Sequence, residues 1–512
     1  MLRAIDKLIN ATTMYRLVLY YLGGLLILGL ALSAAGVLPV DPVGIITTTV
    51  VLLAVSVGTN LLFSRLLGVW TNQESSIITA LILALIAGPV SVTGDPTRLG
   101  IIALAGVFAI ASKYVLVLHK QHIFNPAALG IFLTGIIFGE YASWWVGNSV
   151  MLPAVIAGGI LVLRKISRFR FVGIFLGLYA LFVATSSLSQ GLPLPMVLQS
   201  FGYVFLHTEV IFLAVVMLTE PVTSPGRFHQ QVFYIAIVAF FLLPTLTIFG
   251  MSFSPAEALL LGNIFSFAVS RNRRLVLPLS RRVEHGGGIT TFAFPYPQGF
   301  NHKVGQYMEW TLPLVSSDNR GNRRYFSIAS APSEEELLVT ARFYDRSSSY
   351  KEHLAAMEPG DTIIASELSG DFVLPSDSSK PLAFIAGGIG ITPFRSMIKH
   401  LVNTGEKRDI VLLYSNYGPE EMVFCDLFQE AQEKVGVKTV HTLTDPQRVP
   451  ADWKGETGFI DSSMIATTVP RAQERLYMVS GSPAFVEHMK TALRKLGVRR
   501  TRIRTDYFPG YA

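Results

Sequence analysis

The chain has 512 residues, of which 51% are hydrophobic and only 15% charged, and its formal net charge is +7. A soluble protein of this size carries roughly 25% charged residues, and the deficit falls on residues 17–270, so the composition excludes a wholly soluble protein. The single cysteine, Cys425, excludes internal disulfides, a four-cysteine iron–sulfur cluster and a zinc ribbon, so no metal site is predicted.

Residues 1–270 are predicted to form a polytopic, all-α membrane domain of about ten helices. Several apolar segments are shorter than the roughly 20 residues that a helix needs to cross the hydrocarbon core. Short segments interrupted by glycine or proline indicate broken helices, which membranes tolerate only where protein buries them. The first segment is long for a signal peptide and predicts an uncleaved helix. The segments lie near residues 17–37, 43–64, 75–89, 99–117, 125–139, 150–163, 171–187, 197–219, 231–250 and 255–270.

Basic residues mark alternate loops of this domain. The opposite set of loops carries only Arg98. By the positive-inside rule, this asymmetry predicts a multi-pass protein of the cell (inner) membrane with its N-terminus and its C-terminal half in the cytoplasm. The lipid bilayer is then a partner, and the pI of about 9.3 needs no nucleic acid to explain it. The basic loop residues are Arg65, Lys113, Lys120, Arg164, Lys165, Arg168, Arg170, Arg227, Arg271, Arg273 and Arg274.

Two short motifs occur twice in the membrane domain. Gly88-Pro-Val-Ser91 returns as Glu220-Pro-Val-Thr223, and Phe124-Asn-Pro-Ala127 returns as Phe253-Ser-Pro-Ala256. The prolines of the two pairs lie 132 and 129 residues apart. Nearly equal offsets indicate a duplicated unit of five helices, and an odd number of spans per unit would invert one copy relative to the other. Chance similarity between proline-containing helix ends is the alternative.

The segments Lys120-Gln-His-Ile-Phe-Asn-Pro-Ala-Ala-Leu129 and Thr219-Glu-Pro-Val-Thr-Ser-Pro225 resemble two signatures of the RnfD/NqrB family of membrane flavoproteins. The resemblance implies a flavin held between the two repeats, with Asn125 and Thr223 among its contacts. Family members with covalent FMN carry an Asp-x-x-Ser/Thr-x-Ala-Thr acceptor, and Ala184-Thr185 lacks the preceding acid. A non-covalent FMN, riboflavin or quinone is therefore expected.

The rest of this multi-domain chain reads as soluble sequence. Residues 271–285 are basic and are predicted to form a juxtamembrane linker held by anionic lipid. Residues 286–376 are predicted to form an antiparallel β-barrel, because alternating segments occur at 290–294, 337–343 and 361–365. From 377 to 512 strands and helices alternate, which is typical of an α/β nucleotide-binding domain.

The most informative motif of the second half is Ala386-Gly-Gly-Ile-Gly-Ile-Thr-Pro393, which follows the apolar strand 382–385 and opens a helix. The glycines allow a dinucleotide pyrophosphate to approach the backbone, and the helix start offers free N–H groups. Gly387, Gly388, Gly390 and Thr392 are the predicted contacts, although a tight turn alone also explains glycine clusters.

Arg324-Tyr-Phe-Ser327 and the downstream Ser480-Gly-Ser-Pro483 make this half resemble the ferredoxin–NADP reductase family. The resemblance implies FAD, with its pyrophosphate on Arg324 and on the hydroxyl of Ser348. The motif residue Tyr325 would belong to the same site, Phe326 would stack on the isoalloxazine, and Ser327 would donate to its N5 atom.

The resemblance also assigns the nicotinamide pocket. Ser480 takes the place of the family's cysteine and, with Ser327, is the predicted catalytic pair; Gly481 lies beside it. Phe508 would shield the other face of the flavin.

The choice between NADH and NADPH depends on the loop after the strand 411–415, because a 2′-phosphate needs a basic partner there. No basic residue occurs from Asp409 to Glu433, whereas Glu420 and Glu421 do, which favours NADH. Arg448 could still reach in from a later loop and accommodate NADPH.

Together these patterns predict a membrane-bound NAD(P)H dehydrogenase. FAD would take a hydride from the nicotinamide and pass electrons to a flavin or quinone in the membrane domain. A quinone, another redox protein or an acceptor on the far side of the membrane would receive them. The alternative is an ion-transporting or transporter-like protein that its flavin reductase drives or regulates. A mere anchor is disfavoured, because one helix would suffice.

Overall fold

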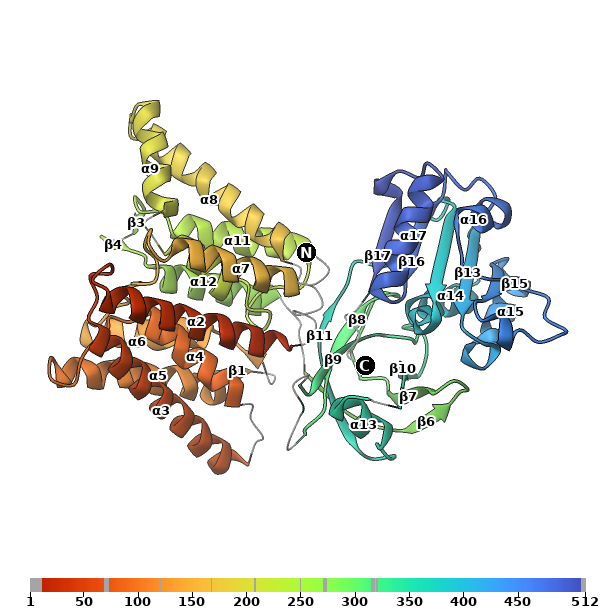
Figure 1. Cartoon of the computed structure of the whole chain (residues 1–512), viewed down its shortest axis with the longest axis horizontal. Helices are drawn as coiled ribbons and strands as arrows, with labels where there is room; N and C mark the ends of the chain where they lie inside the picture. Colours follow the sequence, from red (N-terminus) through yellow and green to blue (C-terminus); the bar gives the residue numbers. More distant parts are fainter. Residues whose placement is uncertain are drawn as a thin grey trace. The chain divides into compact units, whose positions relative to one another are not determined.

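The computed structural model describes residues 12–68, 73–118, 121–166, 168–206, 209–248, 250–269, 274–314, 318, 321–345 and 347–507. The chain divides into two compact units, Met1–Arg273 and Arg274–Ala512, the first built of helices and the second of sheets with flanking helices (Figure 1).

The helical unit has long and short helices. Its elements are α2 (Met14–Ala34), α3 (Pro42–Leu67), α4 (Gln73–Ile86), α5 (Pro96–Val115), β1 (Val117–Leu118), β2 (Gln121–His122), α6 (Pro126–Phe138), α7 (Leu152–Ile166), α8 (Phe169–Ser189), α9 (Leu194–Leu206), α10 (Val210–Phe212), the π-helix η1 (Leu213–Met217), α11 (Phe228–Phe241), β3 (Thr247–Ile248), β4 (Met251–Ser252) and α12 (Pro255–Val269).

The expectation of ten spans needs correction. Among the described residues only α2, α3, α5 and α8 are long and apolar enough to cross a membrane. A fifth is added if α9 and the α10–η1 segment, bent by 59° relative to each other, form one span. The shorter helices are fixed by local capping: α6, for example, starts at the Asn125 cap with Pro126 and stops at Gly139, whose φ is +76°.

The order of elements in the helical unit occurs twice. A helix, a two-stranded hairpin and a proline-started helix follow one another as α5, β1–β2 and α6, and again as α11, β3–β4 and α12. The packing also recurs, because α3 and α6 contact α5 as α8 and α12 contact α11. Between the two halves, α2 packs on α7 and α6 packs on α12.

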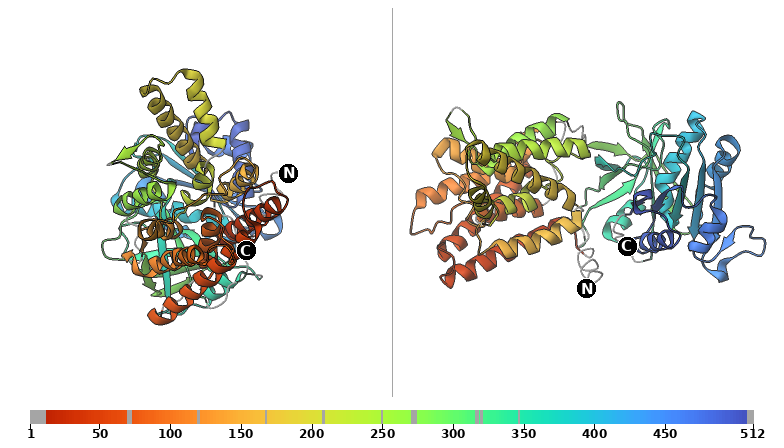
Figure 2. Two further views of the ribbon diagram at one scale, coloured as in Figure 1. Left: turned by 90° about the vertical axis from the view of Figure 1, so that its left-hand side faces the viewer. Right: turned by 90° about the horizontal axis from the view of Figure 1, so that it is seen from above.

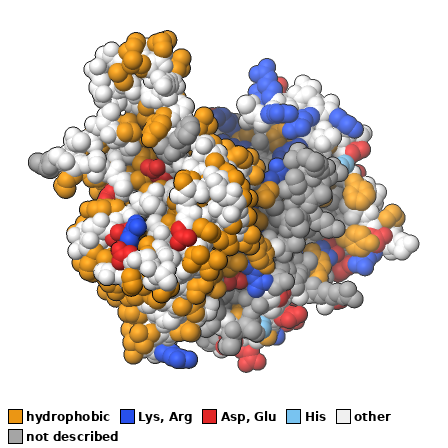
Figure 3. Space-filling view, turned by 60° about the vertical axis from the view of Figure 1, so that its left-hand side comes forward, with side chains coloured by type: hydrophobic (Ala, Val, Ile, Leu, Met, Phe, Trp, Pro, Cys, Tyr) orange, Lys and Arg blue, Asp and Glu red, His pale blue; other side chains and the backbone are white. Residues whose placement is uncertain are grey.

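The outer surface of the helical unit is apolar. Hydrophobic side chains cover much of the face shown in Figure 3, and Ile27, Leu66 and Tyr203 expose between 67 and 71% of their surface. Such a large exposed apolar surface marks contact with a membrane or a partner. The four long helices are therefore compatible with a membrane-spanning segment.

The second unit begins with two antiparallel sheets. One has the strand order β10-β7-β6 and the other β5-β11-β8-β9. The edge strands β5 and β9 of the second sheet contact β7 and β10 of the first, and the two sheets share one core around Phe292, Phe294 and Trp310. The elements are β5 (Leu275–Pro278), β6 (Arg281–Glu284), β7 (Ile289–Pro295), β8 (Tyr307–Thr311), β9 (Arg323–Ser327), β10 (Glu336–Arg342), α13 (Ser349–Ala355) and β11 (Thr362–Ser369).

The strands expected at 290–294, 337–343 and 361–365 are thus confirmed as β7, β10 and β11, but the linker prediction for 271–285 is wrong for its described part. Strands β5 and β6 pair with β11 and β7. Leu277 and Leu279 are buried in the core, and Arg281 forms an ion pair with Glu336 across the sheet. The basic residues of this segment therefore lie in or beside two ordinary strands, β5 and β6.

The C-terminal domain is an open parallel sheet, as predicted. Its six strands have the order β15-β14-β13-β12-β16-β17, and helices cover both faces (Figure 2). Alternate residues of β12 supply the two cores: Phe384 packs towards α14 and α15, and Ile385 towards α16 and α17. The elements are β12 (Leu382–Gly387), η2 (Gly388–Ile391), α14 (Thr392–Thr404), β13 (Ile410–Asn416), η3 (Pro419–Glu421), α15 (Cys425–Val435), β14 (Lys438–Leu443), η4 (Pro446–Arg448), β15 (Glu456–Thr457), α16 (Ser462–Thr468), β16 (Leu476–Ser480), α17 (Pro483–Lys495), η5 (Arg500–Arg502) and β17 (Ile503–Asp506).

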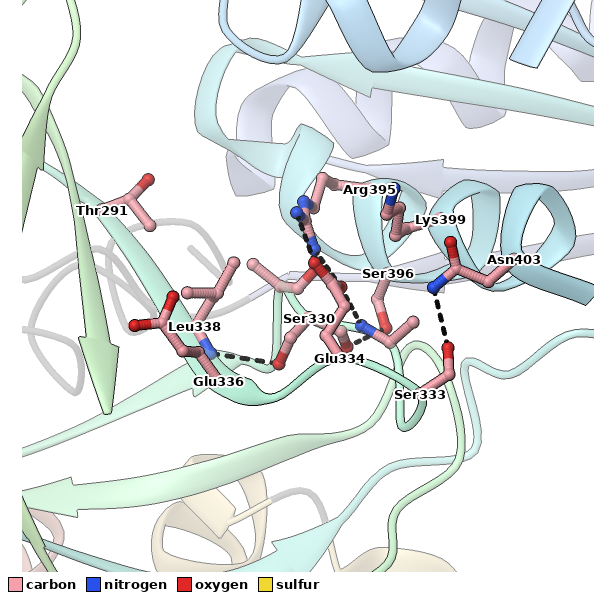
Figure 4. Close-up of polar contacts among 12 residues, drawn as sticks. Thr291, Ser330, Ser333, Glu334, Glu336, Leu338, Arg395, Ser396, Lys399 and Asn403 are labelled. Carbon is pink, nitrogen blue, oxygen red and sulfur yellow. Dashed lines mark hydrogen bonds and ion pairs between the residues drawn. The ribbon is translucent and has the colours of Figure 1, made fainter. Parts of the chain in front are cut away.

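Helix α14 is fastened to the turn between β9 and β10 (Figure 4). Arg395 forms a bidentate ion pair with Glu334, with 2.8 Å between its Nη2 atom and Oε1. Ser396 donates to the backbone oxygen of Ser330 at 2.7 Å, and Asn403 donates to the hydroxyl of Ser333 at 2.9 Å. These bonds hold the nucleotide-binding sheet in a defined position against the barrel.

We expect Glu334→Ala to lower the free energy of unfolding of this unit by about 2–3 kcal/mol, because Arg395 would stay largely buried without its partner. Denaturant unfolding of the purified chain, followed by tryptophan fluorescence, measures the loss. Glu336→Ala is the matched control: its pair with Arg281 is more exposed, so the expected loss is under about 1 kcal/mol. Equal losses in the two variants would contradict a role of Glu334 in docking.

Candidate functional site

The first part of the site lies on strand β9 of the barrel. Arg324 is almost fully buried, and its Nη2 atom donates to the hydroxyl of Ser348 at 3.0 Å. Its guanidinium stacks 4.9 Å from the ring centroid of Tyr350, and the ring of Phe326 lies 6.2 Å from the same ring. The structure therefore brings Arg324, Phe326 and Ser348 together, with Ser348 capping α13.

Two features of this cluster bear on whether an FAD would fit. The hydroxyl of Tyr350, a residue that the sequence reasoning missed, is buried and has no hydrogen-bond partner among the described residues. A buried hydroxyl and a planar guanidinium suit a phosphate-containing ligand. Tyr325, by contrast, lies apart from the cluster: neighbouring residues of a strand face opposite sides, and its hydroxyl donates to Glu367 at 3.0 Å.

The glycine loop lies at the point where the strand order of the parallel sheet reverses. From β12 the chain proceeds outward to β13, and it later returns to place β16 on the other side of β12. Ligands of open α/β sheets bind at such a reversal, beside the carboxyl ends of the strands. Gly387 ends β12, Gly388 has a φ of +52°, and Thr392 begins α14. The placement is the one that the motif predicts.

Gly390 permits an unusually close backbone approach. A β-carbon at this position would lie 2.5 Å from the Ser480 carbonyl oxygen and 2.6 Å from the Gly481 nitrogen. Backbone atoms cannot rotate aside as a side chain can, so glycine is required here. The two motifs, about ninety residues apart in sequence, thus form one surface.

Ser327, Ser480 and Asp506 meet at this edge. Ser480 and Asp506 are partners in the pairing of β16 with β17, and the Ser327 hydroxyl of the barrel interacts with the Asp506 carboxyl and lowers its pKa. Burial raises the pKa of Asp506 to about 7, and the nearby charge of Asp371 adds to the shift. A carboxyl that is poised near neutral pH beside a reaction site can exchange a proton.

Sequence reasoning missed Asp506 and chose Phe508 from the same tail. Phe508 lies outside the described residues, so its proposed contact with the flavin stays a prediction. The available signal was the acid itself, placed at the end of the last strand of a parallel sheet, where ligand-binding residues gather.

The loop after β13 carries two acidic residues with different partners. Glu421 is buried and forms a bidentate pair with Arg342 of the barrel, at 2.8 and 2.5 Å. Glu420 forms an ion pair with Arg448, whose guanidinium also lies 4.8 Å from the Tyr417 ring centroid. Arg448 does reach this loop, as the sequence allowed, but its guanidinium is paired with the Glu420 carboxylate.

A second polar cluster lies inside the helical unit, where the two repeated motifs meet. The side-chain amide of Asn125 donates to Oε2 of Glu220 at 2.7 Å, and the Thr223 hydroxyl donates to the same oxygen at 3.0 Å. Asn263 of α12 accepts from the Asn125 backbone nitrogen at 2.8 Å. The two residues expected to contact a membrane flavin are therefore joined through Glu220, which the sequence reasoning did not select.

Comparison with known proteins places the second unit among the reductases. A family model described as "Oxidoreductase NAD-binding domain" matches residues 384–491. "NADH-cytochrome b5 reductase 1" of Ajellomyces capsulatus is 27% identical over 257 residues, covering 47% of this chain and 81% of that protein. "Flavohemoprotein A" of Dictyostelium discoideum is 28% identical over 244 residues, covering 45% and 59%. The match thus spans a little over half of the flavohemoprotein.

A solved FAD/NAD binding domain of nitric oxide dioxygenase from Vibrio cholerae overlaps 46% of this chain and 99% of its own, at 18% identity and a TM-score of 0.40. A similarity this low does not support an assignment of function. From the family match and the two relatives, the chain is an oxidoreductase. Its C-terminal unit is an NAD(P)H-dependent flavin reductase module, similar to NADH-cytochrome b5 reductase 1 and to the matching part of Flavohemoprotein A.

Proposed function

We propose that the chain is a membrane-bound NAD(P)H dehydrogenase. Electrons enter from the nicotinamide through FAD in the second unit and pass to a non-covalent flavin or a quinone in the helical unit. A quinone or an acceptor on the far side of the membrane receives them. The observation that carries the proposal is the meeting of Ser327, Ser480 and Asp506 at the strand reversal of a nucleotide-binding sheet.

FAD, when bound, accepts an electron pair as hydride and can release the electrons one at a time. The chain's own residues bind and orient the reactants. Arg324 and Ser348 hold a pyrophosphate, because a guanidinium fork and a hydroxyl match phosphate oxygens. Gly387 and Gly390 let the second dinucleotide approach the backbone, and Ser480 lines the nicotinamide pocket. Asp506 holds or releases a proton at its carboxyl and orients the Ser327 hydroxyl.

The helical unit is assigned its role on two supports. The resemblance of its motifs to the RnfD/NqrB family implies a flavin between two inverted repeats. The recurrence of the helix–hairpin–helix order and the polar cluster between the halves support the same proposal. An ion-transporting protein would share this architecture, and the following experiment separates the two.

Counting flavins per chain tests the proposal. Detergent-purified protein is extracted with acid, and FAD, FMN and riboflavin are quantified while NADH oxidation is followed with ferricyanide and with a short-chain quinone. FAD together with a second flavin, or FAD with quinone reduction, supports the proposal. FAD alone with no quinone reduction, combined with NADH-dependent ion uptake into vesicles, would replace it by the transport function.

The preference for NADH is also testable. We expect Glu420→Gln to raise kcat/KM for NADPH about tenfold, because the substitution removes a charge that repels the 2′-phosphate and frees Arg448 to pair with it. We expect kcat/KM for NADH to change less than about threefold, because an exposed ion pair such as that of Glu420 with Arg448 contributes little to stability. A gain confined to NADPH would therefore not come from the loss of that ion pair alone.

Steady-state kinetics with both nucleotides measure this effect, and Glu433→Gln on the exposed face of α15 is the control. Arg448→Gln should lower any NADPH activity further. An unchanged NADPH-to-NADH ratio in Glu420→Gln would place the 2′ group elsewhere.

A further inference from the structure

The polar cluster of the helical unit contains an acid whose two oxygens have different surroundings. Oε2 of Glu220 accepts both hydrogen bonds, from Asn125 and Thr223. Within the described part of the chain, no hydrogen bond reaches Oε1, and the side chain is only half-buried. The carboxyl is thus anchored on one side and open on the other.

Lys113 of α5 is the cation that interacts with this carboxyl. Its ammonium donates at 3.0 Å to both the backbone and the hydroxyl oxygen of Ser75, and at 2.9 Å to the hydroxyl of Thr79. An ammonium has three donors, and all three are used on acceptors. Lys113 is therefore held in place by three hydrogen bonds, whereas the Glu220 carboxyl has one oxygen without a hydrogen bond among the described residues.

The cluster also joins the two halves of the unit asymmetrically. Glu220 follows η1 of the second half, whereas Asn125 caps α6 of the first. At the matching position of the first motif stands Gly88, where a β-carbon would lie 2.5 Å from Nη2 of Arg98. One half therefore offers a carboxyl at the junction and the other has a glycine there, so the acid is not a general requirement of the repeated fold.

An ionisable side chain inside a membrane domain is costly and usually marks an ion or proton pathway. We propose that Glu220 is the proton-exchanging carboxyl of the helical unit, giving a proton to the acceptor that is reduced there and regaining one from water. This inference rests on the proposed function, because it needs an acceptor in that unit.

The chemistry balances for a quinone acceptor. NADH gives up two electrons and a proton, the quinone takes up two electrons and two protons, and the net change is NADH + H⁺ + quinone to NAD⁺ + quinol. One of the two protons on the quinol would come from the Glu220 carboxyl, which becomes a carboxylate near the ammonium of Lys113. Proton uptake from water restores it.

The test compares two acceptors in the full-length, detergent-purified protein. Ferricyanide takes electrons without protons, whereas a short-chain ubiquinone analogue needs both. We expect Glu220→Gln to slow quinone reduction at least about tenfold, since positioned acids contribute 10²–10⁴-fold, and to leave ferricyanide reduction unchanged. Glu140→Gln, which breaks the pair with Arg98 in the same unit, should affect neither.

A second pair of variants separates proton exchange from charge balance. If Glu220 were only the counter-ion of Lys113, the double variant with Lys113→Gln would recover quinone reduction; we expect no recovery. We also expect a small permeant acid, supplied as potassium azide, to restore part of the activity of Glu220→Ala.

The possible outcomes are distinct. Quinone reduction that survives in Glu220→Gln, or returns in the double variant, overturns the inference alone. A wild-type rate that requires Na⁺ overturns it by assigning the carboxylate to a metal cation. A wild-type chain that reduces ferricyanide but no quinone overturns both the inference and the proposed quinone pathway.

Discussion

Replacing Arg324 by alanine is expected to strip FAD from the purified chain and to lower NADH-to-ferricyanide activity about 100-fold or more. The guanidinium is almost fully buried between Ser348 and Tyr350, where two charge-assisted hydrogen bonds to a phosphate would together contribute about 3–4 kcal/mol. Each 1.4 kcal/mol is a tenfold change in affinity. Flavin content after gel filtration and the FAD dissociation constant measure the effect.

Two further variants sharpen this result. Arg324→Lys keeps the charge but loses the planar fork, so we expect intermediate FAD affinity. Arg282→Ala removes an exposed arginine of the same barrel and should leave FAD content unchanged. A chain that keeps stoichiometric FAD after Arg324→Ala would show that the pyrophosphate lies elsewhere.

The second large effect is expected for Asp506→Asn. With a pKa of about 7, this carboxyl changes charge across neutral pH beside the Ser327 hydroxyl. The NADH-to-ferricyanide rate of the wild-type protein should therefore have an inflection near pH 7. In Asp506→Asn we expect the inflection to vanish and kcat to fall about tenfold or more, as for other positioned acid–base groups. Asp377→Asn, an exposed acid of the same unit, should keep the wild-type profile.

Stability gives an independent readout of the same group. The folded pKa of Asp506 is raised above its ordinary value of 3.8, so its contribution to stability is complete below about pH 4 and is lost as pH rises through 7. At pH 8 the asparagine variant should therefore be more stable than the wild type, by about 1–4 kcal/mol. The upper limit of this range is set slightly below the full effect of the pKa shift, because the Asp506 side chain is only half-buried and water screens its charge. A pH-independent difference would show that the carboxyl titrates normally.

Much of the second unit follows from sequence because its signals are local. The strand 382–385, the glycine turn and the helix after it lie within a dozen residues, and the structure forms them as expected. The contact between Ser327 and Asp506 could not be read in this way. It depends on how the barrel docks against the sheet, which the pair of Arg395 and Glu334 helps to fix.

For the helical unit, less of the structure could be predicted from the sequence. The repeated motifs at 124–127 and 253–256 do lie at corresponding places, because each precedes a helix that begins at its proline, α6 at Pro126 and α12 at Pro255. Hydropathy, however, does not separate the four or five described helices that are long enough to span a membrane from the shorter ones, because both kinds share the same apolar composition and differ mainly in length. The linker prediction for 271–285 failed because it rested on the basic residues alone. The sequence does not indicate that Arg281 pairs with Glu336 on another strand.

The close approach at Gly390 has a consequence for how this protein can diverge. The backbone oxygen and nitrogen that face Gly390 are present whatever side chain stands at position 480. Random libraries should therefore return only glycine at 390 while tolerating several small residues at 480. The backbone shape of the glycine loop is therefore expected to stay constant as the sequence diverges, whereas the side chain at position 480 can change.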